Sequence, residues 1–194
     1  MIPYGRHSIN NYDLKQVSKA LKSNFLTTGP FLKKFEERIK LITKAKYSLA
    51  CSSGTAAIHL VLLSLNIKKD DVILMPSITF IASFNISKML GAKIYLVDVD
   101  PATGQMTPET LEKCIKENNL KKIKVIFTMY LGGSPENVDK FFKIKKKYNS
   151  ILIEDACHAL GAKYKIGKTV FNIGSCAHSD FCVFSLHPLK TITS

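Results

Sequence analysis

The chain has 194 residues, of which 46% are hydrophobic, so it can bury one substantial core, and this length argues against a second complete domain. No run of about 18 uninterrupted apolar residues occurs, and the N-terminus lacks the pattern of a secretory signal peptide, so we expect a soluble, cytoplasmic protein with no membrane partner. The formal net charge of +13 suggests nucleic acid, but the lysines follow helix and strand patterns with no nucleic-acid motif beside them, so we expect no nucleic-acid partner.

Two amphipathic helices are predicted at the start of the chain. Leu14, Val17 and Leu21 recur at helical spacing, and a second helical pattern spans residues 31–42. Between them, a glycine and a proline mark residues 24–30 as a loop.

Short apolar runs then alternate with helical patterns along the rest of the chain. The predicted strands are 47–51, 72–75, 94–97, 124–128, 151–153 and 181–184, and for the last of them an antiparallel direction is left open. The predicted helices are 55–64, 79–90, 108–118 and 137–148. This alternation is typical of an α/β fold with a mainly parallel sheet flanked by helices.

Polar side chains follow most of the predicted strands. They are the Ser-Ser-Gly-Thr segment at 52–55, Ser77, Asp98, Asp155 and Ser185. Ligands bind at the carboxyl ends of the strands in open α/β sheets, so we expect a binding site at this edge.

The segment 52–57 leads from a predicted strand into a predicted helix. Its backbone N–H groups and hydroxyls would lie at the positive end of the helix dipole, which suits a phosphate. An ordinary N-cap explains Ser53 or Thr55 equally well. The segment matches neither the P-loop motif nor the dinucleotide-binding glycine motif.

Three further side chains near the predicted strand ends have both a functional and a structural explanation. Asp155 follows a continuous apolar strand, where a carboxylate could keep a cofactor's ring nitrogen protonated, or it could cap the next turn. Phe80 could cover a planar cofactor or belong to the core. His158 could reach a cofactor oxygen or be a packed structural histidine.

Lys190 lies downstream of the last predicted strand, and a single lysine in a lysine-rich chain is weak evidence for catalysis. A phosphate cradle, a carboxylate for a ring nitrogen, an aromatic cover and a lysine on one sheet edge together describe a site for pyridoxal phosphate (PLP).

The five cysteines indicate neither a disulfide framework nor a common zinc pattern, because no Cys-x-x-Cys pair is present. Cys176, His178 and Cys182 lack a fourth ligand at a matching spacing. We therefore expect reduced thiols and no metal.

With these residues assembled, the chain resembles the N-terminal part of the DegT/DnrJ/EryC1/StrS family of PLP-dependent sugar aminotransferases. The resemblance runs over essentially the whole chain. Its matching segments are 3–6, 26–30, 53–57, 79–80, 97–100, 154–159 and 184–190.

The resemblance implies roles for individual residues. Lys190 would form the Schiff base with the cofactor, Asp155 would pair with the pyridine nitrogen, Phe80 would stack on the ring, and His158 would lie near its hydroxyl. The phosphate would be held by Gly54, Thr55 and Ser185, and the sugar-nucleotide site would be lined by Tyr4, Asn24, Phe25, Leu26 and Thr27.

The resemblance also implies the activity, which is transfer of an amino group from L-glutamate to the 4-keto group of a nucleotide-linked 4-keto-6-deoxy sugar. The residues around Tyr4 and His187 are most similar to the branch that aminates UDP-linked N-acetylhexosamines on the way to pseudaminic acid. Aminotransferases of TDP-keto-sugars share most of these residues and remain an alternative. Sugar dehydratases of the family lack the lysine, so Lys190 favours amino transfer.

The resemblance divides the chain into an N-terminal helix and substrate loop at 1–30 and an incomplete PLP-binding large domain of the aspartate aminotransferase type at 31–194. Family members continue into a C-terminal small domain and form homodimers, so we expect this small domain to be absent here and a homodimer in the full-length form. The alternative function is a truncated or split product that folds and binds PLP but is inactive alone.

Overall fold

The strands of the central sheet are short apolar runs, most of which are buried. The computed structural model describes residues 6–193 and contains a five-stranded sheet with the order β2-β1-β3-β4-β7. These strands are β1 (Val72–Pro76), β2 (Lys93–Val97), β3 (Val125–Met129), β4 (Ile151–Asp155) and β7 (Phe181–Val183). Every neighbouring pair is parallel. The predicted α/β fold with a mainly parallel sheet is therefore confirmed.

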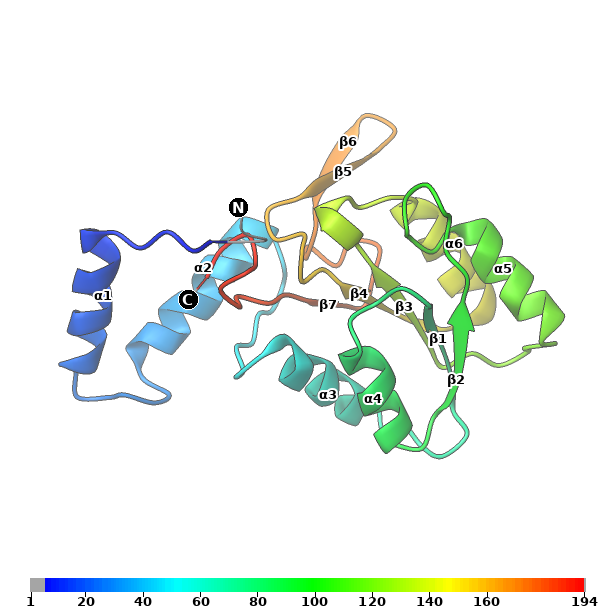
Figure 1. Cartoon of the computed structure of the whole chain (residues 1–194), viewed down its shortest axis with the longest axis horizontal. Coiled ribbons are helices and arrows are strands. Elements are labelled where there is room, and N and C mark those ends of the chain that lie inside the picture. The colour runs from blue at the N-terminus through cyan, green and yellow to red at the C-terminus, as the bar shows by residue number, and fades with distance from the viewer. Residues whose placement is uncertain (1–5, 194) are drawn as a thin grey trace.

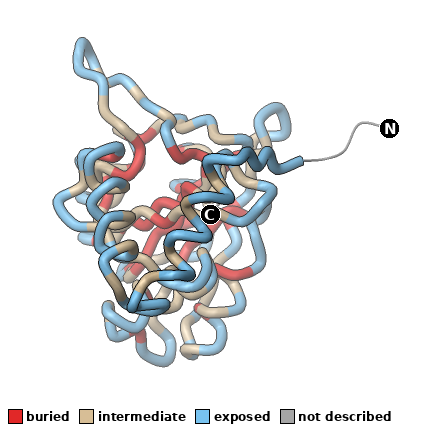
Figure 2. Tube along the Cα trace, turned by 90° about the vertical axis from the view of Figure 1, so that its left-hand side faces the viewer, coloured by how far each residue is buried: buried red, intermediate tan, exposed pale blue. Residues whose placement is uncertain are grey.

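Helices cover both faces of this sheet (Figure 1). One layer contains α3 (Gly54–Ser64) and α4 (Ala82–Met89), and the other contains α5 (Pro108–Glu117) and α6 (Val138–Tyr148). Successive side chains of a strand point to opposite faces, so Ile153 packs in one core cluster with Leu62 of α3, and Leu152 packs in the other with Leu111 of α5. Figure 2 shows the buried segments gathered in the interior of the molecule.

Two helices precede the sheet and lie to its left in Figure 1. They are α1 (Asn11–Leu21), which starts with a capping box at Asn10, and α2 (Pro30–Thr43), which starts with a proline. The apolar side chains of α1 are exposed within the described part of the chain, and Leu21 for example is 66% exposed. The amphipathic pattern therefore predicted the helix correctly, although its apolar side contacts no core here.

Some predicted elements were wrong. Residues 47–51 form no strand, and Tyr47 and Leu49 are 78% and 79% exposed. The segment pairs with no strand of the two described sheets. The Ala50 N–H donates to the Glu36 carboxylate instead (2.9 Å). The direction that was left open for the last strand is parallel, and α4 begins at Ala82 rather than at 79.

An antiparallel hairpin was missed between the last two strands of the sheet. It consists of β5 (Lys163–Ile166) and β6 (Thr169–Asn172) and projects from the molecule in Figure 1. Gly167 in its two-residue turn has φ 58°, which glycine adopts without strain. A short 3-10 helix, η1 (Leu131–Gly133), follows β3. Within residues 6–193, no helix is long and apolar enough to cross a membrane.

The helix α3 offers a direct test of the core. Leu62 is 0% exposed and its neighbour Leu63 is 51% exposed. We expect Leu62→Ala to lower the free energy of unfolding by about 2–5 kcal/mol, because it removes buried methyl groups and leaves a cavity. The matched control Leu63→Ala should change it by no more than about 0.5 kcal/mol. Urea unfolding followed by circular dichroism measures both, and equal losses would contradict this packing.

Candidate functional site

The carboxyl ends of β4 and β7 bring two of the predicted site segments together. Asp155 is the last residue of β4 and lies in register with Val183 of β7. Ser185 follows two residues later, and the turn that contains Lys190 comes next. Parallel pairing therefore places Asp155 and Ser185 at the same edge of the sheet.

The amino end of α3 lies at this edge as well. The Ser53 hydroxyl accepts the Ala56 N–H (3.1 Å) and so caps the helix. The N–H groups of Gly54 and Thr55 belong to the first turn, where a helix provides no internal acceptor. These two groups and the helix dipole make the end of α3 suitable for an anion such as a phosphate.

Gly54 is the point at which three segments meet. A Cβ atom on Gly54 would lie 3.2 Å from Cys157 Sγ and 3.5 Å from both the Phe184 carbonyl oxygen and Ser185 Cβ. The start of α3, the turn after β4 and the segment after β7 are therefore in direct contact. The absence of a side chain at Gly54 lets α3 pack closely against these two segments, which brings its first N–H groups near Ser185.

Asp155 is 3% exposed, and strand alternation puts its side chain on the same face as Ile153, which is the face covered by α3 and α4. Its Oδ1 accepts the Cys157 N–H (3.1 Å), which is the local capping bond that a structural role would give. The carboxylate therefore stabilises the turn after β4 and also lies on the same face as the amino end of α3.

The positive charge of Lys190 affects the pKa values of two residues close to Asp155 in the sequence. Burial is the main reason that the pKa of His158 is lowered, and the positive charge of Lys190 lowers it further while Asp155 opposes the change. Burial, and then the charge of Asp155, raise the pKa of the Cys157 thiol, which Lys190 opposes. Because Lys190 and Asp155 both act on His158 and Cys157, these four groups lie within electrostatic range of one another.

Local hydrogen bonds shape the segment that carries Lys190. The His187 N–H donates to the Ser185 hydroxyl (3.4 Å), and the Lys190 N–H donates to the His187 carbonyl (2.8 Å). The Leu189 N–H donates to His187 Nδ1 (3.3 Å). Lys190 is half-buried in this turn.

Phe80, the predicted aromatic cover, and residues 24–27, the predicted substrate loop, are more exposed than Asp155. Phe80 precedes α4 and is 62% exposed, so the alternative that it belongs to the core is wrong. Residues 24–27 join α1 to α2 and are exposed, on the side of the molecule toward which the chain leaves β7 (Figure 1). Tyr4, the remaining predicted substrate residue, lies outside the described residues.

Three residues next to the site were not predicted to contribute. Cys157 was recognised only as part of a matching segment, and it lies between Gly54 and Asp155. Tyr130 and Glu154 form a buried pair directly behind Asp155. The pair of acidic residues that ends an otherwise apolar strand was a usable signal for Glu154, because a carboxyl group in a buried strand needs a partner.

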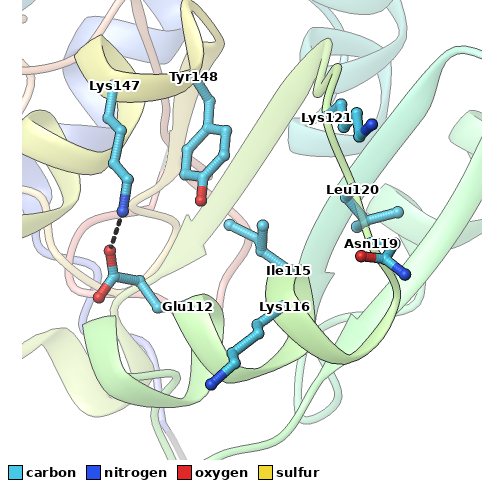
Figure 3. A pocket seen from close by; sticks show the side chains of 8 residues that line it. All are labelled: Glu112, Ile115, Lys116, Asn119, Leu120, Lys121, Lys147 and Tyr148. Carbon is cyan, nitrogen blue, oxygen red and sulfur yellow. Dashed lines mark hydrogen bonds and ion pairs between the residues drawn. The ribbon is translucent and has the colours of Figure 1, made fainter.

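A surface hollow of about 410 Å³ lies elsewhere, between the carboxyl ends of α5 and α6 (Figure 3). Its lining includes Lys116, Lys121 and an ion pair between Glu112 and Lys147 (2.9 Å). The two helices end shortly before β3 and β4 begin, so the hollow lies near the amino ends of these strands, at the opposite end of the sheet from Asp155. Lysines there stabilise the carbonyl ends of the helices, which does not favour an anion site.

The contact at Gly54 leads to a prediction about the cradle. We expect Gly54→Ala to weaken PLP binding several-fold, because the new methyl group forces Cys157 away and narrows the approach to the helix amides. The double variant Gly54→Ala/Cys157→Ala should recover most of the affinity, since the nearest atom is then removed. Fluorescence titration with PLP measures both, and equal affinities of wild type and Gly54→Ala would contradict the cradle.

Known proteins of one family resemble the chain in sequence and in structure. A model of the DegT/DnrJ/EryC1/StrS aminotransferase family matches residues 7–194. Among solved structures, the chain is similar to a putative sugar aminotransferase of Streptococcus pneumoniae in its PLP form, with 30% identity over 99% of this chain and 50% of that chain and a TM-score of 0.86.

Two further solved structures have more specific descriptions. One is PseC of Helicobacter pylori, an aminotransferase involved in the biosynthesis of pseudoaminic acid, with 26% identity over 98% of this chain and 49% of that chain and a TM-score of 0.82. The other is a GDP-4-keto-6-deoxymannose-3-dehydratase mutant with bound GDP-perosamine, with 25% identity over 100% of this chain and 49% of that chain and a TM-score of 0.86. The chain thus spans about half the length of the solved structures that it matches.

Proposed function

Because the chain belongs to the DegT/DnrJ/EryC1/StrS family of PLP-dependent sugar aminotransferases, we propose that it binds PLP and transfers an amino group from L-glutamate to the 4-keto group of a nucleotide-linked 4-keto-6-deoxy sugar. The observation that carries this proposal is the convergence of α3, the turn after β4 and the segment after β7 at Gly54, with the charge of Lys190 beside it. When bound, PLP would supply a carbonyl carbon that carries the amino group and a ring that withdraws the electrons left at the donor's α-carbon.

The phosphate is held by the amino end of α3 and by the segment after β7. The N–H groups of Gly54 and Thr55 donate to it, and the hydroxyl of Ser185 adds a further donor from the contacting segment. The contact of Gly54 with Cys157 and Ser185 supports this assignment, because it fixes the donors in one small region.

Asp155, Phe80 and His158 would hold the ring of the cofactor. The buried carboxylate of Asp155 would keep the ring nitrogen protonated, since an opposite charge nearby raises the pKa of that nitrogen by about 1–3 units. Phe80 would stack on the ring and exclude water, and His158 would lie near the ring hydroxyl. The exposed Phe80 side chain has no core contact to give up in this role.

Lys190 is the catalytic residue. Its amine would hold the cofactor covalently, and the same amine, once freed, would take the proton from the donor's α-carbon and deliver it to the C4′ carbon of the cofactor. The turn that contains Lys190 follows Ser185, and the charge of Lys190 acts on Cys157 and His158, which supports this role.

The sugar nucleotide is proposed to bind at Tyr4 and at Asn24, Phe25, Leu26 and Thr27, within the N-terminal segment 1–30, with residues 31–194 as the cofactor-binding part. The similarity to PseC favours a sugar on the way to pseudaminic acid. We propose that this sugar is UDP-linked, with a TDP-linked sugar as the alternative. A homodimer is proposed for the full-length form.

A half-reaction tests the proposed function. Purified protein mixed with PLP should develop a visible absorbance band, and L-glutamate should then discharge the band and release 2-oxoglutarate in stoichiometric amount. D-glutamate serves as the control, because the site should bind the donor in one configuration only. Absence of the band would contradict cofactor binding.

A second candidate function is cofactor binding without turnover. The exposure of Phe80 and of residues 24–27 favours it, because an open site admits water and leaves the substrate loop without support. It predicts the same absorbance band but no release of 2-oxoglutarate, so the half-reaction separates the two functions.

A further inference from the structure

Tyr130, one residue beyond the end of β3, is bonded to the end of β4 in two ways. Its hydroxyl donates to Glu154 Oε1 (2.6 Å), and its backbone N–H donates to the carbonyl of Asp155 (3.2 Å). Tyr130 and Glu154 are each 2% exposed. One buried residue therefore fixes both of the acidic residues with which β4 ends.

The two bonds act on opposite sides of the strand. Asp155 shares a face with Ile153, which packs toward α3, whereas Glu154 shares a face with Leu152, which packs toward α5 and α6. A rotation of the strand end that turned the Asp155 carboxylate away from the α3 side would also pull Glu154 from Tyr130. The Tyr130–Glu154 hydrogen bond on one face of the strand thus resists a reorientation of Asp155 on the other face.

A buried Tyr–Glu pair with only a structural role would stabilise the fold less than an apolar pair could. A buried carboxyl group destabilises the fold unless its hydrogen bonds are satisfied, and an apolar residue of similar size could fill the same space. Burial raises the pKa of Glu154, and burial together with the nearby Glu154 carboxyl raises that of Tyr130 well above its usual value. The Tyr130–Glu154 hydrogen bond fixes the orientation of the end of β4, which an apolar contact would not.

We propose that Tyr130 and Glu154 form a clamp that orients Asp155 toward the cofactor's ring nitrogen, and that both are positioning residues. The clamp rests on the proposed function, because it needs PLP bound with its nitrogen at Asp155. It predicts that loss of the Tyr130 hydroxyl changes the protonation of the ring nitrogen without any change at the phosphate cradle.

Nitrogen-15 NMR of the protein loaded with PLP labelled at its ring nitrogen reads this protonation directly. Wild type should show the protonated shift, whereas Tyr130→Phe and Glu154→Leu should show a mixture with the unprotonated form. Their PLP affinity should fall about tenfold, which is the size expected for one buried hydrogen bond. Glu154→Gln should retain the wild-type signal, because its amide oxygen still accepts from Tyr130.

Tyr164→Phe is the matched control. Tyr164 is a half-buried tyrosine that packs against the same hydrophobic cluster as the buried Tyr130, but its hydroxyl hydrogen-bonds His178 Nδ1 (2.7 Å) instead of Glu154. Tyr164→Phe should lower the unfolding temperature but leave the nitrogen signal unchanged.

The outcomes separate the clamp from the proposed function. If wild-type protein takes up no PLP, the proposed function is overturned and the clamp with it. If wild type binds PLP with a protonated nitrogen, and Tyr130→Phe and Glu154→Leu keep that signal as Tyr164→Phe does, the clamp alone is overturned. If one of the two loss variants does not fold, the other decides.

Discussion

Replacing Lys190 by alanine should abolish the visible absorbance band that the wild-type protein develops with PLP, and should lower the rate of amino transfer from L-glutamate by a factor of about 10²–10⁴ or more. The physical reason is that one amine performs two tasks, since it holds the cofactor covalently and then moves the proton at the donor's α-carbon. Absorbance spectroscopy and single-turnover kinetics measure the two losses separately.

The control for this variant is another lysine in the same chain. Lys168 lies in the exposed turn between β5 and β6, so Lys168→Ala removes an equal charge away from the site. It should keep both the band and the rate. PLP should still bind to Lys190→Ala, about 10- to 1,000-fold more weakly, because the cradle at α3 remains. An unchanged band in Lys190→Ala would contradict the assignment of this lysine.

Replacing Asp155 by asparagine should lower the affinity for PLP and the rate of proton transfer together. An asparagine of the same shape can still accept the Cys157 N–H, so the turn after β4 should persist while the negative charge is lost. Because that charge raises the pKa of the ring nitrogen by about 1–3 units, its loss costs about 1.4–4 kcal/mol, or 10- to 1,000-fold. Titration with PLP and the half-reaction with L-glutamate give the two numbers.

Asp98→Asn provides a matched control, since Asp98 follows β2 at the same edge of the sheet but is exposed. It should change neither measurement by more than about twofold. Equal losses in the two variants would show that the edge needs negative charge in general, and would contradict a specific contact of Asp155 with the ring nitrogen.

The parts of the fold that could be predicted are those in which local pattern and burial agree. The run at 151–153 is apolar throughout, as a strand buried on both faces must be, and it became β4. The run at 47–51 is apolar as well, but a strand also needs a neighbour to pair with, and Leu49 is exposed instead. The β5–β6 hairpin was missed because the exposed residues of β5 are Lys163 and Lys165, which weakens the apolar signal.

The candidate site was predictable to the extent that it lies at strand ends. Asp155 and Ser185 lie at the same end of the sheet because the carboxyl ends of parallel strands lie together, which the alternation of elements already indicated. The contact of Cys157 with Gly54 joins residues about a hundred positions apart and depends on backbone approach, so no local pattern could reveal it. The Tyr130–Glu154 bond also depends on the pairing of β3 with β4.

The most direct test of the account is to identify the lysine that holds the cofactor. The protein is mixed with PLP, reduced with borohydride, digested and analysed by mass spectrometry. The account predicts one modified peptide, with the phosphopyridoxyl group on Lys190, and no such peptide in the presence of excess inorganic phosphate, which competes for the cradle at Gly54. Modification of another lysine in preference to Lys190, or equal labelling of many lysines, would contradict it.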